Sequence, residues 1–323
     1  MMINYRLIFP NFLNNILNNR TASYLLLAIL SIIWGSSFIL MKEGLKTLSG
    51  VQVAALRISV GGLIFAPIII RHIRKIKKKD LRFVLLAGVI GNGIPAFLFA
   101  IAQTKVDSAM AGVLNGLTPF FTLVIGAAFS LLIVTRDKVV GVIIGLLGAT
   151  AIVLGKDIQH LLDGGFSAAS TLTFSPYIFL IVLATIGYGA NINLIKTKLS
   201  GYQAFSISAI PLFFISIPGL FIFLSSDTSV LADLSSNNQT IKSVGAVVIL
   251  ALFGNSLSLI MFNKLIQMSG PFFAASVTYF IPVVALLWGL LDGESFVWMQ
   301  LVGFVLVIAG VYLVNKRVSP KPN

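Results

Sequence analysis

The chain has 323 residues, of which 57% are hydrophobic and 10% are charged, and its formal net charge is +13. Because this number of polar residues is too small to cover a soluble globule of this size, the composition excludes an ordinary soluble domain and predicts a membrane protein. The chain has no cysteine, which excludes disulfides, thiolate metal sites and cysteine nucleophiles.

Ten apolar runs follow a mixed N-terminal segment. Residues 1–21 combine Ile, Leu and Phe with Asn and Arg, which predicts an interfacial helix or a disordered lead. A bilayer core about 30 Å thick takes roughly 20 helical residues, and each later run has about that length. We predict transmembrane helices at residues 22–41, 51–70, 81–102, 109–134, 139–155, 177–195, 204–224, 243–263, 271–291 and 297–314.

A polar connection divides these runs into two groups of five. Residues 156–175 contain Gly, Ser and charged residues, which is typical of a linker. We therefore predict a first five-helix repeat at residues 22–155, a second at residues 176–315 and a cytoplasmic tail at residues 316–323.

The two groups are related by an internal duplication. Residues 91–131 return as residues 254–294 at a constant offset and without a gap. The identical positions pair Gly91 with Gly254, Asn92 with Asn255, Phe99 with Phe262, Ala111 with Ala274, Pro119 with Pro282, Leu123 with Leu286 and Gly126 with Gly289. The flanks pair Trp34 with Tyr188, Gly35 with Gly189, Ser37 with Asn191, Gly141 with Gly303 and Gly148 with Gly310. A Gly-Asn pair and a lone proline kept in one register indicate a true repeat, and each proline is expected to kink its helix.

The basic residues predict how the chain crosses the membrane. With the N-terminus inside, most of the 23 Lys and Arg residues fall on the cytoplasmic side, including the block at residues 71–82. Because these charges lie in short loops between apolar runs, they indicate topology and not nucleic-acid binding.

An odd number of crossings in each half makes the second half enter the membrane in the opposite sense from the first. The predicted fold is therefore an all-α membrane protein with ten transmembrane helices, arranged as two inverted five-helix repeats with both termini cytoplasmic. Inverted repeats build transporters whose substrate site lies near the midplane between the halves.

Polar residues inside the runs are the first candidates for such a site. Asn92 and Asn255 place amides in hydrocarbon, so they either reach a substrate in a cavity or hydrogen-bond between helices. Asn115 and Thr278 allow the same two interpretations.

Two aromatic residues lie deep in their runs, away from the interfacial belts where Trp and Tyr gather. Trp34 and Tyr188 therefore form either a cavity wall or ordinary packing, and Ser37 and Asn191 beside them supply a hydroxyl and an amide. The candidate substrate-binding residues are thus Trp34, Ser37, Asn92, Asn115, Tyr188, Asn191, Asn255 and Thr278.

Charged residues near the ends of the runs have several interpretations. Arg57 either reaches the outer headgroups, clamps a carboxylate of the substrate or pairs with Glu43. Lys42 and Lys196 are expected to extend their amines to the interface. No acidic residue and no histidine lies at the centre of a run, so no proton relay is predicted, and we expect movement down the substrate's gradient or exchange.

Enzyme signatures are missing from the sequence. His72 and His160 are expected in loops, no HExxH or GxSxG motif occurs, and no two carboxylates fall together in a run. The chain is predicted not to be an enzyme and to need no metal or cofactor. A membrane-embedded enzyme acting on lipid and a receptor-like helical bundle remain as alternatives.

Five short stretches resemble a known family. WGSSF at residues 34–38, KEGL at 42–45 and AALR at 54–57 resemble the opening of an EamA domain of the drug/metabolite transporter superfamily. YFIPVVALL at residues 279–287 and GE at 293–294 resemble its proline-containing fourth helix and its terminal Gly-Glu.

The resemblance implies a ten-helix carrier of the bacterial inner membrane, often an exporter of amino acids or related metabolites. It also implies a central cavity lined by helices 1, 3, 4, 6, 8 and 9. We expect a monomer that takes a small-molecule substrate. The halves differ at Ser208, which matches Arg57, and at Ser130-Leu131, which match Gly293-Glu294.

Overall fold

The computed structural model describes residues 19–106, 108–129, 131, 134–155, 158–159, 176–291 and 297–315. Within these residues all regular structure is helical. By length and composition, helical stretches that can cross a membrane span Thr21–Gly44, Gly50–Ile73, Lys78–Ala102, Met110–Ala128, Ile178–Leu199, Ala204–Ser225 and Asn238–Ser269. Pro271–Val284 and Trp298–Val314 are shorter apolar helices. The protein is thus a helical membrane protein.

The helices of the first half follow the predicted apolar runs. They are α2 (Asn19–Gly44), α3 (Gly50–Leu63), η2 (Ala66–Ile68), α4 (Ile69–Ile73), α5 (Lys78–Gly88), η3 (Val89–Gly93), α6 (Ile94–Ala102), α7 (Ser108–Asn115), α8 (Thr118–Ala128) and α9 (Arg136–Val153). The predicted run at residues 109–134 is broken between α7 and α8, because Pro119 has no N–H to donate and sits in the first turn of a new helix.

The helices of the second half follow in the same way. They are α11 (Ile178–Leu194), η4 (Ile195–Leu199), α12 (Ala204–Ser225), α13 (Ser229–Ala232), η5 (Asp233–Ser235), α14 (Asn238–Ile249), η6 (Leu250–Leu257), α15 (Ser258–Ser269), α16 (Pro271–Ala275), η7 (Ser276–Phe280), α17 (Ile281–Leu291) and α18 (Trp298–Asn315). The run predicted at residues 243–263 is longer in the structure, because Asn237 caps the helix with its side chain and holds polar residues in the first turn.

Several sequence predictions need correction, and others concern residues outside the described ranges. His72 was expected in a loop but belongs to α4, where its Nδ1 lies 3.0 Å from Ser206 Oγ. The helix begins at Asn19, before the end of the predicted lead. The lead up to residue 18, most of the linker, the tail, His160, Ser130 and Gly293-Glu294 lie outside the described residues.

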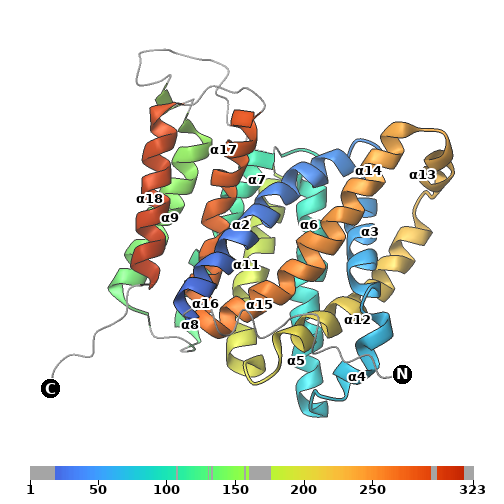
Figure 1. Cartoon of the computed structure of the whole chain (residues 1–323), viewed down its shortest axis with the longest axis horizontal. Helices are drawn as coiled ribbons and strands as arrows, with labels where there is room; N and C mark the ends of the chain where they lie inside the picture. The colour runs from blue at the N-terminus through green and yellow to red at the C-terminus, as the bar shows by residue number, and fades with distance from the viewer. Residues whose placement is uncertain are drawn as a thin grey trace.

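The helices stand side by side, with α9 and α18 together at one end (Figure 1). These two helices meet through glycines that the duplication pairs. A Cβ on Gly141 would lie 2.7 Å from the carbonyl oxygen of Gly310, and one on Gly148 would lie 2.7 Å from that of Gly303. Small residues let membrane helices approach closely, which explains why these positions are glycine.

Aromatic contacts at the centre of the molecule are reciprocal between the halves. The ring of Trp34 lies 4.9 Å from that of Phe262. The duplication maps this pair onto Tyr188 and Phe99, whose rings stack at 5.9 Å. Each half therefore places the aromatic residue of its first helix on the third helix of the other half.

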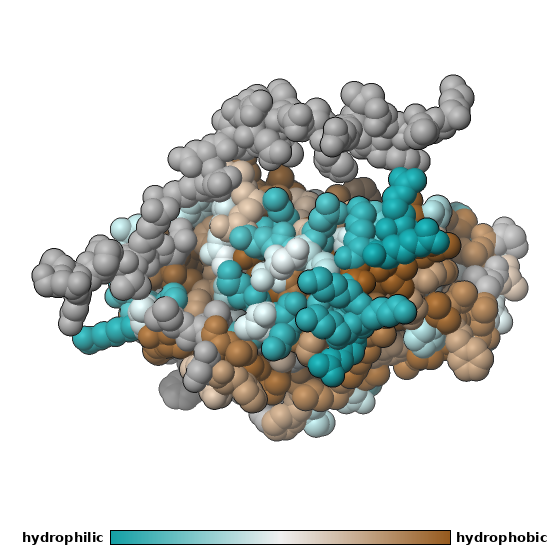
Figure 2. Space-filling view, turned by 90° about the horizontal axis from the view of Figure 1, so that it is seen from below, coloured by the Kyte–Doolittle hydropathy of each residue, from teal (hydrophilic) through white to brown (hydrophobic). Residues whose placement is uncertain are grey.

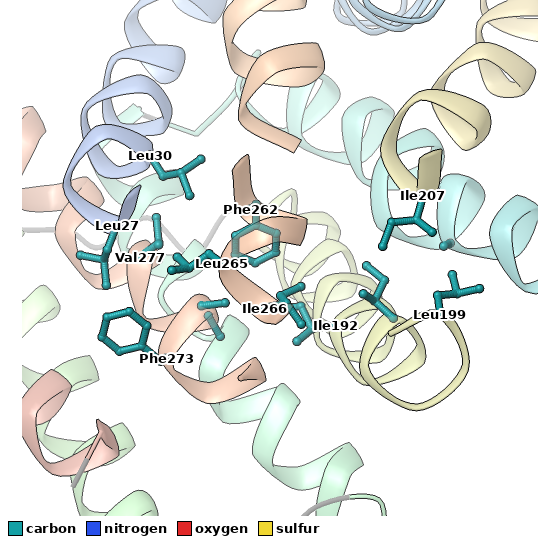
Figure 3. Packing of buried hydrophobic residues seen from close by; sticks show 14 of the residues in the cluster. Leu27, Leu30, Ile192, Leu199, Ile207, Phe262, Leu265, Ile266, Phe273 and Val277 are labelled. Carbon is teal, nitrogen blue, oxygen red and sulfur yellow. The ribbon is translucent and has the colours of Figure 1, made fainter. Parts of the chain in front are cut away.

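The largest buried hydrophobic cluster joins the two halves (Figure 3). It includes Leu27 and Leu30 of α2, Ile192 of α11, and Phe262 and Leu265 of α15. It extends to Ile76 and Val84, next to the turn between α4 and α5. Apolar side chains from both halves therefore pack together at this end of the molecule.

The turn between α4 and α5 carries a basic face. Its seven basic residues are exposed, and they are Arg71, Arg74, Lys75, Lys77, Lys78, Lys79 and Arg82. Figure 2 shows hydrophilic residues gathered on the surface at this end. A hydrophobic wall around most of the molecule and a charged end are typical of a protein whose end faces the lipid headgroups.

Candidate functional site

A cavity of about 100 Å³ lies between the two halves. It is enclosed by α2, α3, η3 and α6 to α8 of the first half, and by α11, η6, α15, η7 and α17 of the second. Its volume is several times the roughly 10–15 Å³ of free space that a single water needs. The cavity can therefore hold a group larger than a single water.

All eight candidate residues line this cavity. They are Trp34, Ser37, Asn92, Asn115, Tyr188, Asn191, Asn255 and Thr278. The duplication and the depth of these residues in the apolar runs were therefore enough to select, from the sequence, residues that line one cavity. Whether they bind a substrate stays a prediction.

The paired asparagines lie in π-helical turns. Asn92 belongs to η3 and Asn255 to η6, so the duplicated Gly-Asn pairs adopt the same local structure. A π-turn widens the helix by one residue and is frequent at functional sites. The glycine before each asparagine allows a close approach, since a Cβ on Gly254 would lie 2.9 Å from Ser37 Oγ and one on Gly91 would clash with Asn191.

The amides of the cavity are incompletely paired. The side-chain amide of Asn92 makes no hydrogen bond within the described part of the chain, and Asn191 Oδ1 is buried without a partner there. Asn255 Oδ1 accepts a hydrogen bond from Arg57 Nε at 2.6 Å. Buried amides normally find partners, so the unpaired ones are available to a ligand or to water.

The serine and threonine hydroxyls of the cavity donate to backbone carbonyls three or four residues earlier in the chain. Ser37 donates to the carbonyl of Ile33 at 2.8 Å, and Thr278 donates to that of Ala275 at 3.0 Å. Thr118 donates to the carbonyl of Asn115 at 2.8 Å. Such bonds satisfy a hydroxyl's proton and leave its lone pairs as acceptors.

The two aromatic candidates differ in how their polar groups are used. Trp34 Nε1 lies 3.1 Å from the carbonyl oxygen of Gly254 and 3.0 Å from Ser258 Oγ, so it donates to the opposite half. The hydroxyl of Tyr188 makes no hydrogen bond within the described residues, although Tyr188 lines the cavity. Trp34 thus joins the halves, while Tyr188 retains a free polar group.

Arg57 also lines the cavity, although it was not among the eight candidates. The possible pairing of Arg57 with Glu43 is wrong. Glu43 lies 2.5 Å from Lys46 Nζ and accepts a hydrogen bond from Gln239 at 2.7 Å. The signal in the sequence was a lone arginine inside an otherwise apolar helix, but only the packing shows which way it points.

The part of the site that the structure describes has no acidic lining. Among the described residues, no Asp or Glu lines the cavity, and no group of His, Cys, Asp or Glu is arranged to hold a metal ion. The described charge of the cavity is therefore that of one arginine.

Comparison with known proteins gives the family. Residues 21–154 and again residues 175–316 match the EamA-like transporter family. The chain belongs to this family. The double match covers both halves, so the chain is an EamA-like membrane transporter built from two EamA units.

Relatives of this EamA-like protein are named as transporters. An uncharacterised transporter of Archaeoglobus fulgidus is 26% identical over 91% of this chain and 99% of its own. The uncharacterised inner membrane transporter YedA of Escherichia coli K12 is 28% identical over 88% of each chain. A probable amino-acid metabolite efflux pump of Salmonella typhimurium is 25% identical over 87% of this chain and 91% of its own.

A solved structure supports the fold alone. It is 14% identical and has a TM-score of 0.66, covering 91% of this chain and 96% of its own.

The names of the relatives point to transport and not to catalysis, in agreement with the sequence prediction.

Proposed function

We propose that this EamA-like protein moves a small metabolite through the central cavity by alternating access. The observation that carries the proposal is the cavity between two sequence-matched halves, lined by the eight candidate residues. Two related units that exchange conformations can open one cavity to either side of a membrane. The proposed binding residues are those eight, with Arg57 added.

The proposed fold is ten transmembrane helices in two inverted five-helix repeats. The reciprocal contacts of Trp34 with Phe262 and of Tyr188 with Phe99 support it, because a two-fold relation exchanges the first and third helices of the halves. The exposed basic face supports a cytoplasmic position for the turn between α4 and α5, and hence for both termini.

The conformation described is closed toward the basic face. Along α2 the clustered residues Leu27 and Leu30 precede the cavity residues, and along α15 Leu265 and Ile266 follow them. Ile192 belongs both to the cluster and to the cavity wall. In the proposed topology, the cytoplasmic route is blocked and must open during transport.

The proposed substrates are amino acids or related metabolites, and the proposed direction is export from a bacterial cytoplasm. The Salmonella relative named as a probable amino-acid metabolite efflux pump supports both. We further propose a monomer that binds no nucleic acid and needs no cofactor.

Counterflow in liposomes tests the proposal. Purified protein should exchange a labelled amino acid or a related acid against internal unlabelled compound. Asn92→Ala should lower the exchange rate, whereas Phe221→Ala should not, because Phe221 is 73% exposed on the apolar outer surface. If a broad screen of metabolites gives no flux while the protein modifies lipid, the enzyme alternative replaces the carrier.

A further inference from the structure

The chemistry around Arg57 defines one class of ligand. Arg57 lies on α3, is partly buried and lines the cavity. Its guanidinium has five N–H donors, and the described residues use one of them, at Nε, for Asn255 Oδ1. No carboxylate of the described residues pairs with Arg57. The ion pair found among these residues joins Lys46 and Glu43.

A partly buried cation without a counter-ion is unfavourable unless another anion completes its surroundings. The bond at Nε leaves the two Nη groups of Arg57, which form a planar fork that matches the two oxygens of a carboxylate. The same cavity offers no acidic side chain within the described residues for a cationic ligand. The cavity therefore favours a ligand with a negative group.

We infer that Arg57 recognises a carboxylate of the transported substrate and so makes the carrier selective for carboxylic acids, including zwitterionic ones, over their uncharged or cationic analogues. This inference rests on the proposed function, because it assigns a substrate to the same cavity. Arg57 is a binding residue, and Asn255 is the residue that positions it.

The position of Asn255 is itself fixed by the π-turn. The next residue, Ser256, donates to the carbonyl of Gly61 at 2.7 Å, which ties η6 to α3 one turn beyond Arg57. The bond between Arg57 and Asn255 therefore joins two elements that are already held together. The guanidinium is presented in one place before any ligand binds, which reduces the entropy lost on binding.

The charge occurs on one side of the cavity only. The duplication matches Arg57 with Ser208, which is fully buried and accepts a hydrogen bond from Asn263 Nδ2 at 2.7 Å. Ser208 is absent from the cavity wall. A bound acid is thus oriented, with its carboxylate at α3 and η6 and the rest of the molecule toward the remaining wall, which includes Trp34 and Tyr188.

Matched pairs of compounds test the inference on the unaltered chain. Each amino acid and 2-oxo acid of a panel is compared with its carboxamide by thermal shift and by competition in counterflow. Acids should raise the apparent melting temperature and compete, since a ligand that binds the folded state stabilises it. The matching amides should do so about tenfold to a hundredfold less well, as expected for losing a hydrogen-bonded charge.

Variants at two positions complete the test. Arg57→Gln should lose the preference for acid over amide, Arg57→Lys should keep part of it, and Asn255→Asp should lose it because an internal carboxylate occupies the guanidinium. Equal binding of acids and amides, no acid-dependent shift anywhere in the panel, or full acid preference in Arg57→Gln would overturn the inference. If Arg57→Gln does not fold, the comparison of acids with amides on the native chain still decides.

The two proposals fail in different ways. Flux of amides or organic cations equal to that of acids would reject the role of Arg57 and leave the carrier intact. Binding of acids that depends on Arg57, with no flux of any compound, would reject transport and leave the binding role intact.

Discussion

Side chains from both halves meet at the cavity. Some of them are hydrogen-bonded to the other half, and others have no hydrogen-bond partner within the described residues. Arg57 donates to Asn255, and Trp34 donates to Gly254 and Ser258, so these groups are already bonded across the halves. Asn92 is matched to Asn255 by the duplication, yet its side chain makes no hydrogen bond within the described residues. The two asparagines should therefore respond differently to the same substitution.

Asn92→Ala should weaken substrate binding with little change in thermal stability, because no described partner loses a bond. Asn255→Ala should also lower stability, by about 1–3 kcal/mol, since it removes the described partner of Arg57 and leaves a partly buried charge less well paired. Melting curves and counterflow on both variants measure the two effects. Equal destabilisation by the two changes would show that Asn92 serves helix packing and not ligand binding.

At the scale of elements, the sequence predicted the locations of the helices well, because long apolar runs have few other solutions. It predicted a kink at Pro119, where the structure instead breaks the run between α7 and α8. It also grouped the eight candidate residues that line the cavity, whose role in binding stays a prediction. The π-turns at η3 and η6 could not be predicted, because the apolar pattern is the same whether a helix has the ordinary or the wider turn. The contact between Arg57 and Asn255 could not be predicted either, since it depends on packing between distant segments.

The glycine contact between α9 and α18 is sensitive to one added methyl group. In Gly148→Ala the new Cβ would lie 2.6 Å from the Val307 backbone nitrogen and 2.7 Å from the Gly303 carbonyl oxygen, so the helices must separate. Overpacking of this kind costs about 1–3 kcal/mol. Gly245→Ala is the matched control, because a Cβ there meets nothing within 4 Å and the alanine favours the helix. A melting temperature for Gly148→Ala equal to that of the control would mean that the two helices tolerate separation.

Hydrogen bonds of Tyr202 join the second half to the turn between α4 and α5, which carries the basic face. Tyr202 donates to Asp80 Oδ2 at 2.6 Å and accepts from the Lys77 backbone N–H at 3.3 Å. Donation to the Asp80 carboxylate raises the pKa of Tyr202 above its ordinary value near 10. The bond is therefore present at neutral pH, and it is lost as the pH rises through that raised pKa, because the phenolate has no proton to donate.

Tyr202→Phe should make the closed end open more often, because it removes this bond and leaves the ring. The readout is thiol labelling of a single cysteine introduced at Ile266, which is fully buried in the cluster. The rate should rise in Tyr202→Phe and stay unchanged in Tyr312→Phe, since Tyr312 is 62% exposed on α18. If both variants label at the native rate, the apolar cluster alone holds this end closed.

At the scale of the whole molecule, closure and charge lie at the same end. The apolar cluster reaches Ile76 in the turn between α4 and α5, and the basic residues of this turn are exposed. Figure 2 shows hydrophilic residues gathered on this surface. The opposite end carries the segment of α13 and η5, where Asp227 accepts the backbone N–H of Ser229 at 2.9 Å, and this bond lowers the pKa of Asp227. The two ends thus differ in charge, and this difference predicts which one faces the cytoplasm.

The basic end should be cytoplasmic, because positive loops are retained on the inner side of the membrane. The native chain has no cysteine, so single cysteines report their own positions. Lys78→Cys lies on the exposed basic face, and Ser236→Cys lies exposed before α14 at the other end. A membrane-impermeant maleimide should label Ser236→Cys in intact cells and should label Lys78→Cys only after the membrane is permeabilised. Labelling of Lys78→Cys in intact cells, with Ser236→Cys protected, would reverse the topology and place the closed end of the cavity outside.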